Sequence, residues 1–322
     1  MTGGIQLANA IEFGLSFALS LVMIFVIIPW LIPKLRAKGM VGKDLNKPTH
    51  PEVAELGGIA VVIAFFAGVS LLLALDGVND RELLEVSLST VLGAAFIGLI
   101  DDIFELRQRQ KAFFPFLLAL PLGAALNPTI TIPYLGDVNF GSWMLVAAPF
   151  AITCAANAGN MLEGFNGLGT GLGIIMTTAL VSMAILHDRL DGMFLLVPLL
   201  GALVGFLWFN KFPAKIFPGD TLMLFMGATI AAAGMLSSLY IQTTLIFMPL
   251  ILEFFLKSRG HFRAQNYCSE SSNGYLEYHG RIESLTHLVM KSNKRTEQQV
   301  VGTIWLLEAV VCLVVVMVDI LL

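Results

Sequence analysis

Long apolar runs separated by short polar breaks constrain this chain more than any other sequence feature. Each run is close to the length of about 20 residues that a helix needs to cross a bilayer. Lipid offers no partners for backbone N–H and C=O groups, so spanning segments must be helices or closed barrels. Charged residues make up only 13% of the chain, against roughly 25% in soluble domains.

The sequence therefore predicts an all-α, polytopic integral membrane helix bundle with about ten transmembrane helices. We expect one membrane-embedded domain over residues 1–322. The expected spans are residues 9–33, 57–75, 84–100, 112–127, 141–158, 168–186, 192–209, 220–238, 241–256 and 299–321.

Positive charge is distributed unevenly between the polar breaks. Because the spans alternate in direction, successive breaks fall into two sets on opposite sides of the membrane. One set is poor in positive charge and holds only Arg81 and Arg189 of the 19 Lys and Arg residues. The positive-inside rule makes the richer set cytoplasmic and places both termini outside. The richer set comprises residues 34–56, 101–111, 159–167, 210–219 and 257–298, the last a long cytoplasmic substrate-binding loop.

The break at residues 128–140 belongs to the external set. Apolar and polar residues alternate in it, and Gly136-Asp137 is a typical turn dipeptide. This pattern predicts a small external β-hairpin, and we assign no chemistry to it.

An acidic pair ends the third apolar run. Asp101 and Asp102 are followed closely by Arg107 and Lys111. Carboxylates at the end of a membrane helix are costly and are functional candidates by default. Helical spacing places Asp101 and Glu105 on one face, with Asp102 about 100° away. The alternative is an interfacial charge cluster that only ends the helix.

Three asparagines within ten residues mark the end of the fifth run. Asn157 and Asn160 are spaced to share a helix face, and Asn166 follows in a glycine-rich segment. Amide oxygens suit Mg²⁺, which prefers oxygen ligands. Glycines permit close approach of the backbone to a ligand. The alternative is helix packing through small residues and interhelical amide bonds.

A third cluster opens the eighth run. Pro218 and Gly219 place Asp220 and Thr221 at a helix start. Asp220 could be a simple N-cap, or a metal ligand beside backbone amides that face a phosphate.

Two further polar groups lie in the richer set of breaks. One is Asp44-Leu-Asn46-Lys47 with Glu55, for which the alternative is a basic juxtamembrane segment on anionic lipid. The other is His279 with Arg281 in the long loop, a pair suited to phosphate. Together the clusters supply oxygen ligands for a metal and cations for phosphates, the equipment of phosphoryl transfer.

At these residues the chain resembles the polyprenyl-phosphate N-acetylhexosamine-1-phosphate transferase family. The resemblance covers nearly the whole chain in motif order and spacing, and is greatest to the branch that loads N-acetylglucosamine phosphate onto dolichyl phosphate. The motifs are Asp-Leu-Asn-Lys at 44–47, Asp-Asp at 101–102 with Arg-x-Arg-x-Lys at 107–111, Asn-Ala-x-Asn-x-Leu-x-Gly-x-Asn-Gly-Leu at 157–168 and Phe-x-Gly-Asp-Thr at 217–221.

The resemblance implies a reaction between UDP-N-acetylglucosamine and a polyprenyl or dolichyl phosphate that releases UMP. It implies Mg²⁺, or Mn²⁺ in its place, on Asn160 and Asp220. It implies that Asn166 and Phe217 hold the uracil and that Lys111 contacts the pyrophosphate. The expected catalytic residues are Asp101, Asp102, Lys111 and Asp220. The expected substrate-binding residues are Asp44, Asn46, Lys47, Glu55, Lys111, Asn157, Asn166, Phe217, His279 and Arg281.

The chain departs from the family pattern in two places. His279-Gly-Arg281-Ile stands where the eukaryotic branch has an Arg-His-Arg-like motif, and Glu163 replaces a smaller residue. The alternatives are a phospho-N-acetylmuramoyl-pentapeptide-type transferase and, from another class, a polytopic transporter. Beyond the bilayer and these substrates we expect no nucleic-acid partner, and a homodimer is left open.

Overall fold

The computed structural model describes residues 2–75, 80–132, 136–272, 274–292 and 294–321, most of them in helices. Every expected span coincides with one helix or, at residues 241–256, with two helices that meet at a bend of 54°. The long helices are α1 (Thr2–Ala37), α2 (Gly58–Ala74), α3 (Arg81–Phe104), α4 (Gln108–Ala125), α5 (Met144–Met161), α6 (Leu168–Leu186), α7 (Met193–Asn210), α8 (Gly219–Leu236) and α12 (Glu297–Leu321); the bent pair is α9 (Tyr240–Ile246) with α10 (Met248–Ser258).

These helices confirm a polytopic, mainly helical membrane architecture. Among the described residues, seven helices are long and apolar enough to cross a bilayer, or eight if the bent pair is one span. The apolar helix α2 is shorter, with 17 residues, and α4 begins with the polar residues Gln108–Lys111. The count of ten spans and the external position of the termini therefore stay predictions.

Helix α8 lies at the centre of the bundle and packs against α2, α3, α5 and α7. Its sequence is apolar on all sides, as expected for a helix that other helices surround. Glycines let its neighbours approach: a Cβ atom on Gly98 of α3 would lie 2.6 Å from Cα of Thr221. This contact brings the end of α3 against the start of α8.

The connections carry short strands and helices. Two strand pairs are β1 (Val41–Lys43) with β2 (Glu52–Ala54) and β3 (Thr129–Ile132) with β4 (Gly136–Asn139). A three-stranded sheet contains β5 (Glu270–Ser272), β6 (Tyr275–Glu277) and β7 (Arg295–Thr296). The short helices are η1 (Gly141–Trp143), η2 (Leu190–Gly192) and α11 (Leu285–Ser292). Within the described residues, the predicted loop 257–298 therefore contains three strands and α11.

The predicted hairpin at 128–140 is confirmed, but its predicted Gly-Asp turn is wrong. Gly136 and Asp137 belong to β4, where they pair with Ile132 and Thr131. The Thr131 hydroxyl donates to the Asp137 carboxylate over 2.7 Å, so Asp137 forms a cross-strand pair. The connecting residues 133–135 lie outside the described residues.

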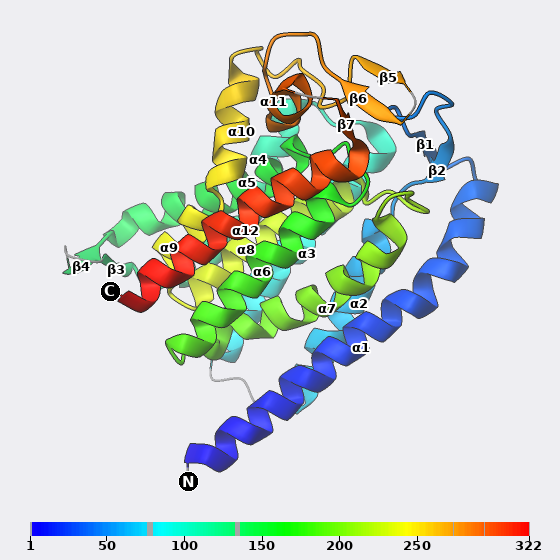
Figure 1. The fold of residues 1–322 in the computed structure, drawn as a ribbon. Helices are drawn as coiled ribbons and strands as arrows, with labels where there is room; N and C mark the ends of the chain where they lie inside the picture. Colours follow the sequence, from blue (N-terminus) through cyan, green and yellow to red (C-terminus); the bar gives the residue numbers. More distant parts are fainter. Residues whose placement is uncertain (1, 76–79, 133–135, 273, 293, 322) are drawn as a thin grey trace.

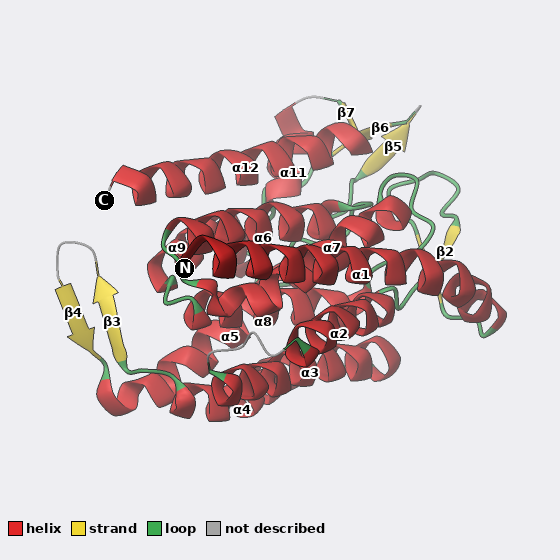
Figure 2. Cartoon of the chain, turned by 90° about the horizontal axis from the view of Figure 1, so that it is seen from below, coloured by secondary structure: helices red, strands yellow, loops and turns green. Residues whose placement is uncertain are grey.

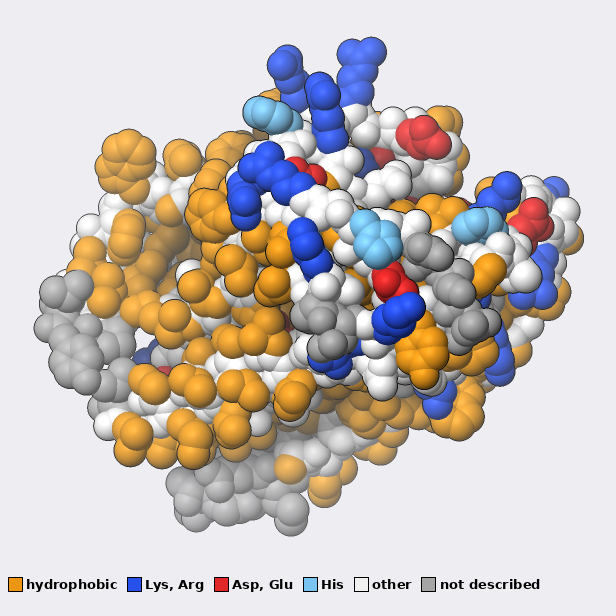
Figure 3. All heavy atoms as spheres, turned by 45° about the horizontal axis from the view of Figure 1, so that its top comes forward, with side chains coloured by type: hydrophobic (Ala, Val, Ile, Leu, Met, Phe, Trp, Pro, Cys, Tyr) orange, Lys and Arg blue, Asp and Glu red, His pale blue; other side chains and the backbone are white. Residues whose placement is uncertain are grey.

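The bundle has two chemically different ends. Both termini lie toward the end with β3 and β4, whereas β1, β2, β5, β6 and β7 lie at the opposite end (Figure 1; Figure 2). Lys and Arg side chains gather over the second of these ends, and the adjoining flank is largely hydrophobic (Figure 3). This charged end carries the candidate site.

Candidate active site

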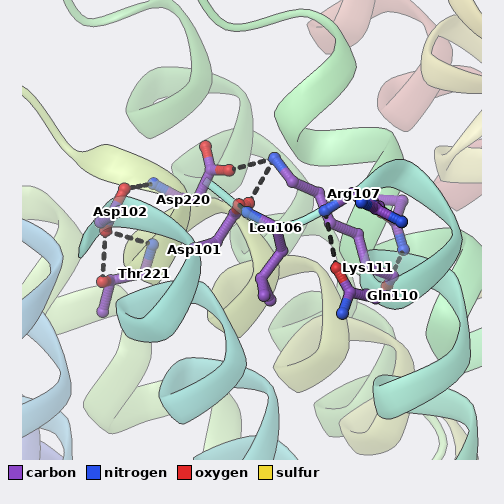
Figure 4. Close-up of polar contacts among 9 residues, drawn as sticks. Asp101, Asp102, Leu106, Arg107, Gln110, Lys111, Asp220 and Thr221 are labelled. Atoms are coloured by element: carbon purple, nitrogen blue, oxygen red, sulfur yellow. Dashed lines mark hydrogen bonds and ion pairs between the residues drawn. The ribbon is translucent and has the colours of Figure 1, made fainter. Parts of the chain in front are cut away.

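The carboxylate of Asp102 caps the start of α8. It accepts hydrogen bonds from the backbone N–H groups of Asp220 (2.6 Å) and Thr221 (2.9 Å) and from the Thr221 hydroxyl (2.5 Å) (Figure 4). The first N–H groups of a helix have no partner within it, and a carboxylate also complements the positive end of the helix dipole. Gly219 has a φ of 70°, and a Cβ atom there would lie 2.7 Å from this carboxylate.

Lys111 joins the other two carboxylates of the cluster. Its ammonium group lies 2.8 Å from Oδ2 of Asp220 and forms a second ion pair with Asp101 (Figure 4). Asp101 is 4% exposed, and its Oδ1 accepts the Leu106 N–H over 2.7 Å. Three helices, α3, α4 and α8, thus contribute one charged group each to a single constellation.

Asn160 brings the asparagine motif to the same place. Its side chain lies within hydrogen-bonding reach of the Asp220 carboxylate, although 60 positions separate them along the chain. Among the described residues, no group of three His, Cys, Asp or Glu could hold a metal. One amide oxygen and one carboxylate still fit Mg²⁺, which is often bound by one or two protein groups with substrate phosphates and water completing its shell.

A pocket of about 340 Å³ opens beside this cluster. Seven predicted site residues line it: Asp44, Glu55, Asp102, Asn160, Asn166, Phe217 and Asp220. The backbone places Phe217 there, because its N–H donates to the carbonyl of Ala54 (2.7 Å) and its carbonyl accepts the N–H of Gly57 (2.9 Å). The pocket therefore combines acidic and amide groups with an aromatic ring.

Two predicted substrate-binding asparagines lie behind the pocket walls. The Asn46 amide donates to the carbonyl of Gly164 (2.8 Å) and accepts the N–H of Cys268 (3.3 Å). The Asn157 amide donates to the carbonyls of Thr153 (2.9 Å) and Lys111 (3.2 Å). These bonds hold the pocket loop and the first turn of α4, so both residues support neighbouring segments. Their contact with substrate stays a prediction.

The remaining predicted residues do not line this pocket. Lys47 forms an ion pair with Asp44 and lies over the ring of Phe212. His279 and Arg281 are exposed in the loop after β6. Their roles in substrate binding also stay predictions.

One helical expectation is wrong. Glu105 does not share a helical face with Asp101, because α3 ends at Phe104 and Glu105 follows it with a φ of 51°. The left-handed conformation ends the helix, and Oδ1 of Asp101 accepts the N–H of Leu106 just beyond it.

Sequence reasoning missed Tyr267 and Glu297. Tyr267 lines the pocket from the long loop. Glu297 begins α12 and is 5% exposed; its carboxylate accepts the backbone N–H of Asn166 over 2.8 Å. An acidic residue in the first turn of a helix is ordinary, so no local pattern distinguished Glu297.

Glu163 is the pocket residue for which we expect a pH effect. Burial raises the pKa of its carboxyl from 4.5 to about 7, although the Gly169 N–H donates to it. Because the folded pKa lies above the unfolded one, the folded state keeps the proton longer, and stability falls as pH rises from about 4.5 to about 7. We expect the melting temperature of detergent-solubilised protein to fall over this range, and to fall less in Glu163→Gln.

The matched control for Glu163 is Glu85→Gln, since the Glu85 side chain is 58% exposed. That variant should keep the wild-type pH dependence. An unchanged slope in Glu163→Gln would contradict the expected burial effect.

Comparisons with known proteins point to one enzyme family. The model described as glycosyl transferase family 4 matches residues 84–238. A candidate UDP-N-acetylglucosamine–dolichyl-phosphate N-acetylglucosaminephosphotransferase of Saccharolobus solfataricus is 39% identical, over 94% of this chain and 95% of its own length. A relative of the same description in Sulfolobus acidocaldarius is 36% identical over 91% and 92%. A phospho-N-acetylmuramoyl-pentapeptide-transferase of Borreliella burgdorferi is 28% identical over 72% and 77%.

The helical membrane fold and these relatives identify a membrane-embedded transferase. The chain belongs to glycosyl transferase family 4, in the branch of the UDP-N-acetylglucosamine–dolichyl-phosphate N-acetylglucosaminephosphotransferases. This result confirms the resemblance drawn from the motifs, and it sets the transporter alternative aside.

Proposed function

We propose that this chain transfers N-acetylglucosamine-1-phosphate from UDP-N-acetylglucosamine to a polyprenyl phosphate of the dolichyl type. A carrier phosphate oxygen forms the new bond to the β-phosphorus of the nucleotide sugar. The bond from that phosphorus to the oxygen of UMP breaks, and UMP leaves. The product would start a lipid-linked oligosaccharide for protein N-glycosylation or a cell-surface glycan, with the site on the cytoplasmic face.

The Lys111 constellation is the observation that carries this proposal. One cation lies between Asp101 and Asp220, beside a pocket that Asn160 and Phe217 also line. Phosphoryl transfer needs positioning and charge neutralisation more than covalent chemistry. A Lys ammonium neutralises phosphate oxygens, and the two carboxylates fix where that ammonium lies.

The geometry favours positioning roles over base catalysis for the acidic pair. All three donors of Asp102 come from α8, and Asp101 is used by Lys111 and the Leu106 N–H. A phosphate monoester has a second pKa of about 6 and is largely ionised near neutral pH. The carrier phosphate therefore needs little help from a base.

Asn160 and Asp220 would hold the divalent cation in this proposal. Their oxygens lie on the pocket wall, and the nucleotide pyrophosphate would supply further ligands. When bound, Mg²⁺ neutralises charge on the phosphate oxygens.

An assay of purified protein tests the proposal. UMP release would be measured with polyprenyl phosphate and a panel of UDP-N-acetylglucosamine, UDP-N-acetylgalactosamine and UDP-N-acetylmuramoyl-pentapeptide, with and without Mg²⁺. We expect release with UDP-N-acetylglucosamine, and only when Mg²⁺ is present. Preference for the muramoyl substrate would establish the alternative transferase, and no release from any of them would overturn the proposal.

Lys111→Ala should weaken binding of UDP-N-acetylglucosamine by about 10- to 100-fold, because a charge-assisted contact to phosphate is lost. Titration calorimetry on the purified variant measures this affinity. Lys38→Ala is the control, since Lys38 is exposed just beyond α1. Equal affinity of the Lys111 variant and the wild type would remove the phosphate role.

A further inference from the structure

Two buried carboxylates hold the Asn166 amide in one orientation. Its Nδ2 donates to Oε1 of Glu297 (2.5 Å) and to Oδ2 of Asp44 (3.0 Å). Each of the three residues is at most 5% exposed. They come from three segments that are far apart in the sequence: the loop after β1, the turn before α6 and the start of α12.

The other polar atom of the Asn166 amide is its oxygen, Oδ1. Oδ1 is buried and has no hydrogen-bond partner among the described residues. A primary amide has one acceptor and one donor end, so the two carboxylates determine which end is left over. Turning the amide would place its oxygen against two carboxylate oxygens and would remove one hydrogen-bond donor from each.

Glu297 contributes more to this arrangement than Asp44 does. Its Oε1 also accepts the backbone N–H of Asn166 over 2.8 Å, so one carboxylate fixes both the backbone and the side chain. Asp44 is already paired with Lys47. Glu297 lies behind Asn166 and does not line the pocket, whereas Asn166 does.

We propose that Glu297 is a positioning residue that holds Asn166 with its oxygen available to the ligand, and that it thereby selects uracil. The inference rests on the proposed function, in which a uridine nucleotide occupies the pocket. Uracil carries a ring N–H at N3, which pairs with an amide oxygen. Cytosine has a bare acceptor nitrogen at this position, which the same oxygen repels.

Binding of UMP and CMP to purified full-length protein tests this inference. The wild type should prefer UMP, and Glu297→Gln should reduce the ratio of the two affinities about tenfold or more, because the Asn166 amide can then turn. A merely structural role would lower the melting temperature without moving this ratio. Glu297→Asp, which keeps the charge but shortens its reach, should give an intermediate ratio and serves if the Gln variant does not fold.

The matched control is Glu308→Gln, another buried glutamate of α12, whose carboxylate accepts a hydrogen bond from the Cys312 thiol over 3.4 Å. It should keep the wild-type preference. An unchanged ratio in the Glu297 variants, or a wild type that binds UMP and CMP equally, would overturn the inference alone. A wild type that neither binds UMP nor releases it from UDP-N-acetylglucosamine would overturn the proposed function, and the inference with it.

Discussion

Replacing Asp220 with Asn should lower UMP release by about 10³-fold or more, while the protein still folds. The substitution keeps the size of the side chain but removes the charge that pairs with Lys111 over 2.8 Å and the carboxylate that lies beside Asn160. Removing one such preorganised electrostatic group typically costs two to three orders of magnitude in rate, roughly. Loss of a metal ligand would add to this effect.

The measurement is initial-rate UMP release at several Mg²⁺ concentrations. Asp137→Asn serves as the control, because Asp137 is an exposed aspartate on β4, at the other end of the bundle. Asn160→Ala should likewise lose Mg²⁺-dependent turnover. Wild-type rates in either the Asp220 or the Asn160 variant would remove the metal assignment.

Replacing Asp102 with Asn should impair both stability and turnover. The carboxylate accepts three hydrogen bonds from the start of α8, whereas Asn offers one oxygen and presents an NH₂ group to the remaining donors. Leaving a buried donor unsatisfied costs about 1–3 kcal/mol. Because Asp220 is part of the same helical turn, we also expect turnover to fall by about 10- to 100-fold, since small misplacement of reacting groups is costly.

Asp80→Asn separates this effect from ordinary helix capping. Asp80 accepts the N–H of Leu83 over 3.0 Å at the start of α3, far from the pocket residues. Asn caps a helix about as well as Asp, so this variant should lose less than about 1 kcal/mol and keep wild-type turnover. Thermal denaturation and UMP release of both variants would be compared. An Asp102 variant with the small effects of the Asp80 variant would contradict the positioning role.

The helical architecture followed from composition because lipid leaves the backbone few choices. Runs as apolar as residues 220–238 must satisfy their own N–H and C=O groups, and each expected span coincides with a helix or the bent pair. Element ends were less predictable. Glu105 was predicted to be helical but has a left-handed backbone conformation, and Gly136 was predicted to be in a turn but belongs to a strand. The conformation of single residues at element ends depends on local capping and strand pairing.

Residue identity alone therefore determined the helical membrane class, the uneven distribution of positive charge and the motif residues that meet at the pocket, such as Asn160 and Asp220. The tertiary structure alone showed that Asp102 caps α8, that the Asn157 amide bonds to the start of α4 and that the Asn166 amide donates to Glu297. The physical reason is the range of the interactions. The free energy of transferring an apolar segment into lipid depends on the residues of that segment alone. A hydrogen bond between residues 131 positions apart forms only when the helices that carry them pack together.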